Sequence, residues 1–390
     1  MTAPSAPFQI RTFGETLMKP FDNVKTCAKV VTMVTVCGIA AFGQGKRASV
    51  MGTGLSPTGI SVVASTVPAN GDVNPYGIAL VTRSKGSLVK GNILVSNFNN
   101  SANLQGTGTT IVQIAPDGTV SLFAQIDGSS LPGPCPGGIG LTTALSVLSS
   151  GWVIVGSLPT TDGTSATAEA GCLLVLNSKG AVVETFYGSL VNGPWDMTAL
   201  DSGSSAVLFV TNVLNGSVAG GGKIVHGGTV VRLALDGLHG KMPTLDSITV
   251  IGSGFPERTD PAALIIGPTG LGLNASADLL YVADSLNNRV AAIPDPVFRA
   301  TSAGIGATLT QGGGLNDPLG LTLSPDGLIL TVNGNNGLLV ETTPDGDQIG
   351  QTFLDSSGNP PGAGALFGLV PVGNGLYYVD DATNTLNLFH

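Results

Sequence analysis

PTGLGLNASADLLYVAD, residues 268–284, begins with a Pro-x-Gly turn and continues as two short apolar segments that a polar turn separates. The same pattern occurs at residues 317–333 and 74–97, where the second apolar segment ends in Asn333 and Asn97. Proline and glycine preset turns, and short apolar segments between turns are typical of antiparallel strands. The stretch therefore predicts a β-hairpin that the chain repeats.

Weaker copies of this hairpin raise the number of units to six. Successive units begin 61, 58, 74, 50 and 48 residues apart, so the loops vary while the hairpins persist. A period near fifty residues with such turns predicts sheets stacked around an axis, which is a β-propeller. The first residues of the six units are Pro75, Pro136, Pro194, Pro268, Pro318 and Leu366.

Each unit also contains a second hairpin, with turns such as Pro-Asp-Gly at residues 116–118 and 344–346. Two hairpins give a four-stranded blade. The last unit has a single strand after Asp380, whereas residues 59–67 form an apolar segment without a hairpin partner. We expect this N-terminal strand to close the ring by pairing with the last blade; the alternative is an independent strand. The predicted fold class is all-β, a six-bladed β-propeller of four-stranded antiparallel blades closed by an N-terminal strand.

The N-terminal region has the pattern of a secretory signal peptide. Residues 30–42 are an apolar run of thirteen, with two lysines before it and small residues near Gly43. Such a run is short for a membrane span and fits an export signal; the alternative is an uncleaved anchor. We expect a signal peptide or anchor at 1–43, a linker at 44–58 and one propeller domain at 59–390. The expected location is extracytoplasmic, either periplasmic or secreted.

Composition and charge exclude some partners. The chain has 57 Gly and 11% charged residues, and removal of residues 1–43 leaves 12 basic and 23 acidic side chains. An acidic body of this kind is unsuited to binding nucleic acid or an anionic membrane by charge. We expect contact with a membrane only through an uncleaved N-terminal segment. The expected partner is an unidentified small molecule, glycan or protein.

Two cysteines, Cys135 and Cys172, remain after residue 43, and both fall in the second unit. An even pair in an exported protein favours a disulfide, and two free buried thiols are the alternative.

The segment ADSLNNRV, residues 283–290, resembles the NHL repeat, together with PTGL at residues 268–271. NHL repeats build six-bladed propellers, and lactonase-like propellers are related to them. The resemblance is good in this unit and partial in the other five, and it covers roughly residues 59–390. It implies the fold and leaves the activity open, because propellers of this type include enzymes, binding scaffolds and structural modules.

Polar residues gather where the units begin and where their second strands end. In propellers these positions usually face one mouth of the channel. One interpretation is that Asn and Asp end strands by bonding local backbone. The other is that they bind a ligand or a hard cation. The candidates for binding at the mouth are Asn74, Tyr76, Trp195, Asp196, Asn288, Asp317, Asn333 and Asp380.

The lactonase-like resemblance implies one divalent metal, held by a Glu, two Asn and an Asp from different blades. Asn97, Asn212 and Asp284 are plausible counterparts of the amide and Asp ligands. No counterpart of the Glu is present, because the first unit begins with Asn-Pro-Tyr at residues 74–76. Oxygen ligands without histidine would favour calcium or magnesium.

Histidine chemistry has little support. His226, His239 and His390 are the only histidines, and their spacing does not suit a zinc site or a Ser-His-Asp triad. Three functions stay open: a binding module at the channel mouth, which we favour, a metal-dependent lactonase-like hydrolase, and a structural surface module. The sequence leaves open whether the chain is an enzyme. The binding module would have no catalytic activity, and an enzyme would be a metal-dependent hydrolase.

Overall fold

The computed structural model describes residues 59–390, apart from residues 241 and 277. The predicted signal peptide and linker therefore lie outside the described residues. Within the described part, no helix is long and apolar enough to cross a membrane.

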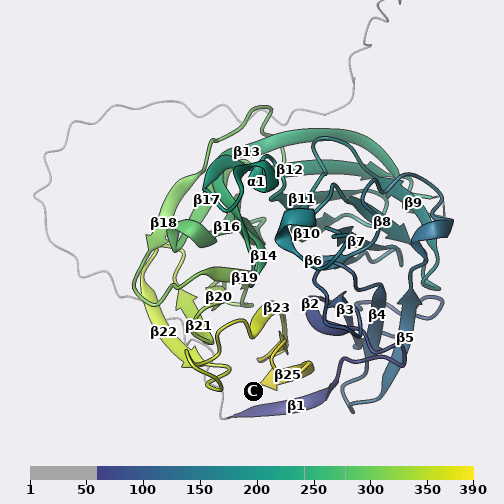
Figure 1. Ribbon diagram of the computed structural model, residues 1–390, viewed down its shortest axis with the longest axis horizontal. Helices are drawn as coiled ribbons and strands as arrows, with labels where there is room; N and C mark the ends of the chain where they lie inside the picture. Colours follow the sequence, from purple (N-terminus) through teal and green to yellow (C-terminus); the bar gives the residue numbers. More distant parts are fainter. Residues whose placement is uncertain (1–58, 241, 277) are drawn as a thin grey trace, which may run out of the picture. The chain divides into compact units, whose positions relative to one another are not determined.

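Six antiparallel sheets form a ring, each with its first strand near the centre (Figure 1). This confirms the predicted six-bladed propeller. We number the sheets as blades 1 to 6 in chain order. Blade 1 consists of β2 (Val73–Leu80), β3 (Ile93–Asn99), β4 (Thr110–Ile114) and β5 (Val120–Gln125). Blade 2 consists of β6 (Leu141–Val147), β7 (Val153–Ser157), β8 (Cys172–Leu176) and β9 (Val182–Phe186).

Blade 3 has a fifth strand, and blades 4 and 5 have four strands each. Blade 3 consists of β10 (Pro194–Asp201), β11 (Ala206–Asn212), β12 (Val225–Asp236), β13 (Thr244–Asp260) and β14 (Leu264–Ile266). Blade 4 consists of β15 (Pro268–Asn274), β16 (Leu279–Asp284), β17 (Arg289–Pro294) and β18 (Ala307–Gln311). Blade 5 consists of β19 (Pro318–Leu323), β20 (Ile329–Asn333), β21 (Leu338–Thr342) and β22 (Gln348–Phe353).

Both ends of the described chain contribute to blade 6. Its strands are β23 (Leu366–Val372), β24 (Gly375–Asp380), β25 (Thr385–Phe389) and β1 (Ile60–Ser65). Strand β1 pairs antiparallel with β25, with Ile60 opposite Phe389, and forms the outer edge of the blade (Figure 1). The missing fourth strand of the last unit is thus supplied from the N-terminal side.

Inner strands are apolar on both sides because neighbouring blades cover both faces. Strand β8, with the sequence CLLVL, is buried at every position. Helical structure is confined to short segments between strands. These are η1 (Gly128–Ser130), η2 (Ser165–Thr167), α1 (Ser217–Gly220) and η3 (Ser285–Asn287).

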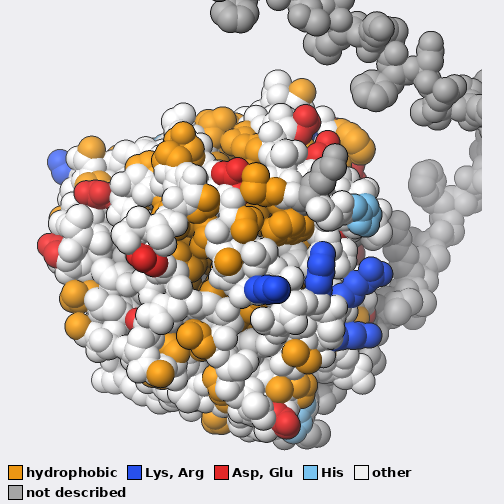
Figure 2. All heavy atoms as spheres, turned by 90° about the vertical axis from the view of Figure 1, so that its right-hand side faces the viewer, with side chains coloured by type: hydrophobic (Ala, Val, Ile, Leu, Met, Phe, Trp, Pro, Cys, Tyr) orange, Lys and Arg blue, Asp and Glu red, His pale blue; other side chains and the backbone are white. Residues whose placement is uncertain are grey.

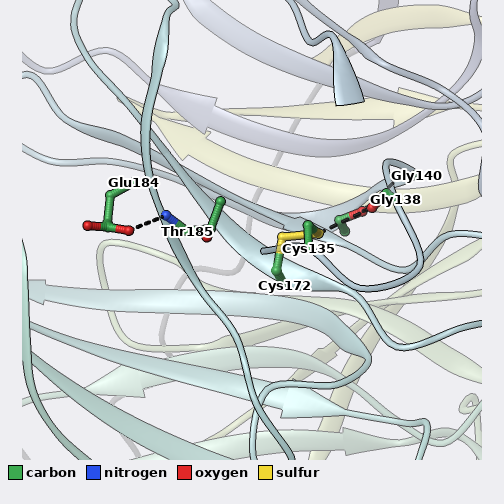
Figure 3. Close-up of a disulfide and its surroundings, with 7 residues drawn as sticks. Cys135, Gly138, Gly140, Cys172, Glu184 and Thr185 are labelled. Atoms are coloured by element: carbon green, nitrogen blue, oxygen red, sulfur yellow. Dashed lines mark hydrogen bonds between the residues drawn. A yellow bond between two sulfur atoms is a disulfide. The ribbon is translucent and has the colours of Figure 1, made fainter. Parts of the chain in front are cut away.

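The predicted disulfide is present. Cys135, in the segment before β6, is bonded to Cys172 at the start of β8, with a sequence separation of 37 (Figure 3). The disulfide joins the segment between blades 1 and 2 to the third strand of blade 2. It restrains the loop that carries η2, residues 158–171.

Strands β13 and β14 form a hairpin that the repeat pattern of the sequence does not predict. Residues Arg258 to Asp260 pair with Ile266 to Leu264. The hairpin is an insertion in blade 3, and it accounts for the longest spacing between units, 74 residues from Pro194 to Pro268. It turns inward, because Leu264 and Ile265 are each 1% exposed and belong to the apolar cluster of the inner strands.

Candidate ligand pocket at the channel mouth

A cavity of about 850 Å³ lies at the mouth where the first strands begin and the second strands end. We call it the mouth pocket. Blades 1, 3, 5 and 6 contribute to it, and its lining is largely polar. The polar lining residues are Asn74, Tyr76, Asn99, Ser101, Asn103, Gln105, Arg258, Asp260, Asp317, Asn335, Asp381 and Asn384.

Aromatic rings form the floor of the mouth pocket. The ring centroid of Tyr76 lies 3.8 Å from that of Phe367 and 4.4 Å from that of Phe98, and both pairs are stacked. Trp195 lies 6.3 Å from Phe367 and 6.4 Å from Tyr76. We call these four residues the aromatic plug. Three of them come from the first strands of different blades, so the plug fills the centre of the ring beneath the pocket.

The β13–β14 hairpin forms one wall of the mouth pocket. Arg258 and Asp260 make an ion pair of 2.7 Å in which both side chains are partly exposed. Gln105, in the loop after β3, donates from Nε2 to the carbonyl of Pro261 at 3.2 Å. This bond ties the hairpin of blade 3 to the loop of blade 1 across the pocket wall.

Amide side chains from blades 1 and 6 also line the pocket, and hydrogen bonds hold them in place. Asn99 donates from Nδ2 to Oδ1 of Asn103 at 2.7 Å. The backbone N–H of Asn74 donates to Oδ1 of Asn384 at 2.8 Å. Both Asn74 and Asn103 have positive φ, 59° and 58°, a conformation that asparagine tolerates better than most residues. The amides are therefore preorganised as hydrogen-bonding groups.

Two carboxyl groups in the mouth pocket hold their protons more tightly than usual. Burial, together with the smaller effect of Asp260 and against the opposing effect of Arg258, raises the pKa of Asp317 to about 6. Burial and the neighbouring Asp380 raise the pKa of Asp381 to about 7. Burial and Asp381 also raise the pKa of Tyr76 well above its usual value. The pocket thus offers carboxyl groups that change protonation near neutral pH.

Asp196 lies at the other opening of the channel, contrary to the expectation from sequence. It lines a cavity of about 330 Å³ at the far ends of the first strands. Its Oδ2 accepts from the backbone N–H of Leu271 at 2.8 Å, and burial raises its pKa to about 7. The pairing of β10 with β11 shifts register between Pro194 and Met197, as the first hairpins of the other five blades also do at this position, so the bulge belongs to the repeat. Asp196 directly follows Trp195 of the aromatic plug, and its side chain lines the other cavity.

Residues at the ends of second strands bond the backbone or the next strand of their own blade. Asn97 donates from Nδ2 to the carbonyl of Thr66 at 3.0 Å, and Asn333 donates to that of Gly314 at 2.7 Å. Asp284 accepts from Nε of Arg289 at 2.7 Å, and both side chains are almost fully buried. Asp380 accepts from the backbone N–H of Thr383. Of these four contacts, only that of Asp380 is to local backbone, because the partners of Asn97 and Asn333 are 31 and 19 residues away and that of Asp284 is a side chain.

The proposed metal ligands provide some of what a cation requires. The side chains of Asn97, Asn212 and Asp284 are fully buried, and Oδ1 of each has no hydrogen-bond partner. However, Asp284 is already paired with Arg289, and among the described residues no hydrogen bond joins any two of the three. In the described part of the chain, no three His, Cys, Asp or Glu residues form a group suited to a metal. A calcium or magnesium site at these residues stays a prediction.

Of the eight residues predicted at the mouth, three line the pocket: Asn74, Tyr76 and Asp317. Trp195 belongs to the aromatic plug, and Asn288 accepts from the backbone N–H of Asp317 through Oδ1. The most important residues that the prediction omitted are Arg258 and Asp260. The long spacing before Pro268 was the available signal for both of them.

Comparison with known proteins gives the fold and no closer relationship. No family model matches the sequence, and no curated protein matches it. Among solved structures, a gluconolactonase from Xanthomonas campestris matches with a TM-score of 0.53 and 11% identity, over 84% of this chain and 88% of that chain. The calcium-binding protein regucalcin from Agrobacterium tumefaciens matches with a TM-score of 0.52 and 13% identity, over 83% and 92% of the two chains.

A third match has different chemistry. The aldose sugar dehydrogenase from Streptomyces coelicolor, described in its PQQ-bound form, matches with a TM-score of 0.51 and 16% identity, over 85% of this chain and 98% of that chain. At such identities the likeness establishes the fold alone. The chain is a six-bladed β-propeller whose structural neighbours include gluconolactonase-like propellers.

Proposed function

We propose that the chain binds a small, neutral, polyhydroxylated ligand, such as a sugar or sugar derivative, in the mouth pocket. The observation that carries this proposal is the combination of amide-lined walls with an aromatic floor in one cavity of about 850 Å³. Known ligand pockets span roughly 300–1,000 Å³. Amide side chains donate to and accept from hydroxyl groups. Tyr76 and Phe367 close the base of the cavity, and because their rings stack on each other and are each 5% exposed, the amides supply the main contacts.

The charge of the pocket supports a neutral ligand over an anionic one. Asp260, Asp317 and Asp381 line it, and its one cation, Arg258, is already paired with Asp260. A ligand carboxylate or phosphate would meet this negative field without a free partner.

Calorimetric titration with a panel of neutral monosaccharides and their lactones tests the binding proposal. The informative variant is Asn335→Ala, because this exposed side chain lines the pocket and its loss does not disturb the core. We expect it to weaken binding about threefold to tenfold, the value of one or two hydrogen bonds. Gln125→Ala, an exposed change on β5, is the matched control and should have no effect.

A lactonase-like hydrolase is the second candidate. The carboxyl groups of Asp317 and Asp381 favour it, because a carboxylate with a pKa near the working pH suits a general base. Such a base would take a proton from the water that attacks the ester carbonyl of a lactone. The gluconolactonase structures among the matches also favour it.

Acid release from a sugar lactone, followed with and without EDTA, tests the hydrolase. We expect the rate to rise with pH through about 6 to 7 as the carboxyl groups ionise, and Asp381→Asn to lower it by about 100-fold or more. Asp246→Asn, an exposed change outside the pocket, should leave the rate unchanged. Loss of activity with EDTA would support the metal-dependent form. A rate equal to that without protein would exclude the hydrolase and leave binding untouched.

A further inference from the structure

A second hollow, of about 300 Å³, lies at the ends of the blades opposite to the mouth pocket. It is formed by the turns between the first and second strands of blades 1, 2 and 3, with His239 after β12. We call it the basic hollow. Its lining residues are Arg83, Ser84, Lys85, Ser149, Ser150, Gly203 and His239.

The lining of the basic hollow is cationic, although the protein is acidic. The chain has a formal net charge of −9, yet two of its few basic residues line this hollow and no Asp or Glu does. Figure 2 shows a group of Lys and Arg side chains close to a His side chain on one face of the molecule. Lys90 lies beside Ser84, to which its backbone N–H donates at 2.9 Å, so the positive field extends beyond the hollow.

The structure fixes Lys85 within the hollow. Its stem crosses Gly151, where a Cβ atom would lie 2.5 Å from Cδ of the lysine and would displace the stem, and the φ of +88° at this position also favours glycine. Its Nζ donates to the carbonyl of Ser150 at 2.6 Å, which leaves two donors of the ammonium group. A lysine held in this way loses little further freedom when a ligand binds.

Other donors in the hollow lack partners. No hydrogen bond or ion pair of the Arg83 side chain occurs with any described residue. Oγ of Ser150 is buried and has no hydrogen-bond partner. Asp201, at the neighbouring turn, accepts from the backbone N–H groups of Ser149 and Gly203 through its two oxygens and keeps its negative charge. The hollow therefore combines free cationic and hydroxyl donors.

We propose that the basic hollow binds the phosphate or sulfate group of a small solute. A tetrahedral oxyanion accepts from several donors at once, which matches a guanidinium, an ammonium and serine hydroxyls converging on one space. The site is independent of the mouth pocket, which has the opposite charge and lies at the other end of the channel.

Tryptophan fluorescence can report binding locally. Trp152 directly follows Gly151 in the sequence. Its indole N–H donates to the carbonyl of Leu238 at 3.3 Å, so the ring also lies close to His239, the next residue after Leu238. Sodium phosphate or sulfate should be titrated against sodium chloride at constant ionic strength. We expect a saturable change in the parent that Trp152→Phe abolishes, whereas the other tryptophan, Trp195, lies in the aromatic plug.

Charge-removing variants decide the outcome. Arg83→Gln and Lys85→Gln should each weaken binding about threefold to tenfold, whereas Lys223→Gln, an exposed change outside the hollow, should not. Arg83→Gln is the safer of the two for folding, because its side chain makes no described contact. The proposal is overturned when neither anion gives a saturable change, or when both variants bind like the parent. Binding of sulfated oligosaccharides or anionic vesicles without binding of inorganic phosphate or sulfate would also overturn it.

Discussion

At the scale of single residues, the sequence predicts which polar side chains lie near the channel mouth better than it predicts the direction in which each side chain points. The sequence identified Asn74 and Asp317 as mouth residues, and both line the pocket. It placed Asp196 with them, but that carboxyl group lines the cavity at the other opening. The position of a residue in the repeat predicts which end of a strand it occupies, but not the side its side chain takes within the bulge that all six first hairpins share.

Buried carboxyl groups should make the protein more stable at mildly acidic pH. Burial raises the pKa of Asp196 from 3.8 to about 7 and that of Glu257 from 4.5 to about 7. Between pH 4 and 7 the folded state therefore binds more protons than the unfolded state, so stability falls as pH rises. We expect the melting temperature to be higher at pH 5 than at pH 8.

Asp196→Asn isolates the contribution of one group. The amide keeps an acceptor for the N–H of Leu271 but carries no charge, so the variant should be more stable than the parent at pH 8 by about 1–3 kcal/mol. The difference should vanish near pH 4. Denaturant unfolding at both pH values measures it, and a variant less stable at pH 8 would show that the charged carboxylate is needed.

Asp284 is the residue on which the metal prediction depends most. Removing one partner of a buried ion pair costs about 3–5 kcal/mol, so Asp284→Ala should be strongly destabilised through Arg289 even without metal. Calorimetric unfolding in EDTA and in calcium separates the two roles. Equal loss in both buffers, with no calcium effect on the parent, supports a structural ion pair. Calcium stabilisation of the parent that the variant lacks would establish the metal site.

At the scale of elements, the repeated hairpin made the fold predictable, whereas the inserted hairpin of blade 3 could not be predicted from the repeat. Six copies of one hairpin determine the number of blades, because each copy can bury its apolar faces only against its neighbours. The β13–β14 hairpin has no counterpart in the other blades, so the repeat contained no information about it. The tip of this hairpin, Leu264 and Ile265, is apolar because it packs in one cluster with the aromatic plug, a contact that only the structure shows.

Strand β1 should be essential for stability. It covers the outer edge of blade 6 through its pairing with β25, and without it that edge would be open to solvent. A chain that begins at Asn70 should therefore aggregate or melt at a clearly lower temperature than one that begins at residue 44. Equal melting temperatures of the two chains, both as monomers, would show that β1 is dispensable.

At the scale of the whole molecule, a rigid ring presents two different surfaces. The mouth pocket is polar and acidic over an aromatic floor, and the basic hollow lies at the opposite ends of the blades. The sequence predicted the ring and the general position of the mouth. It did not predict which residues converge, because the pocket combines segments from four blades and depends on loop conformation.

The most direct test of the central claim is to fill the mouth pocket and measure binding. Ala382 lines the pocket and is exposed, so Ala382→Trp occupies the cavity without removing a core contact. The measurement is the calorimetric affinity of the parent and of this variant for any neutral sugar or lactone that binds the parent. We predict that Ala382→Trp abolishes binding while its melting temperature stays that of the parent. A ligand bound with equal affinity by both proteins would contradict the assignment of the mouth pocket as the functional site.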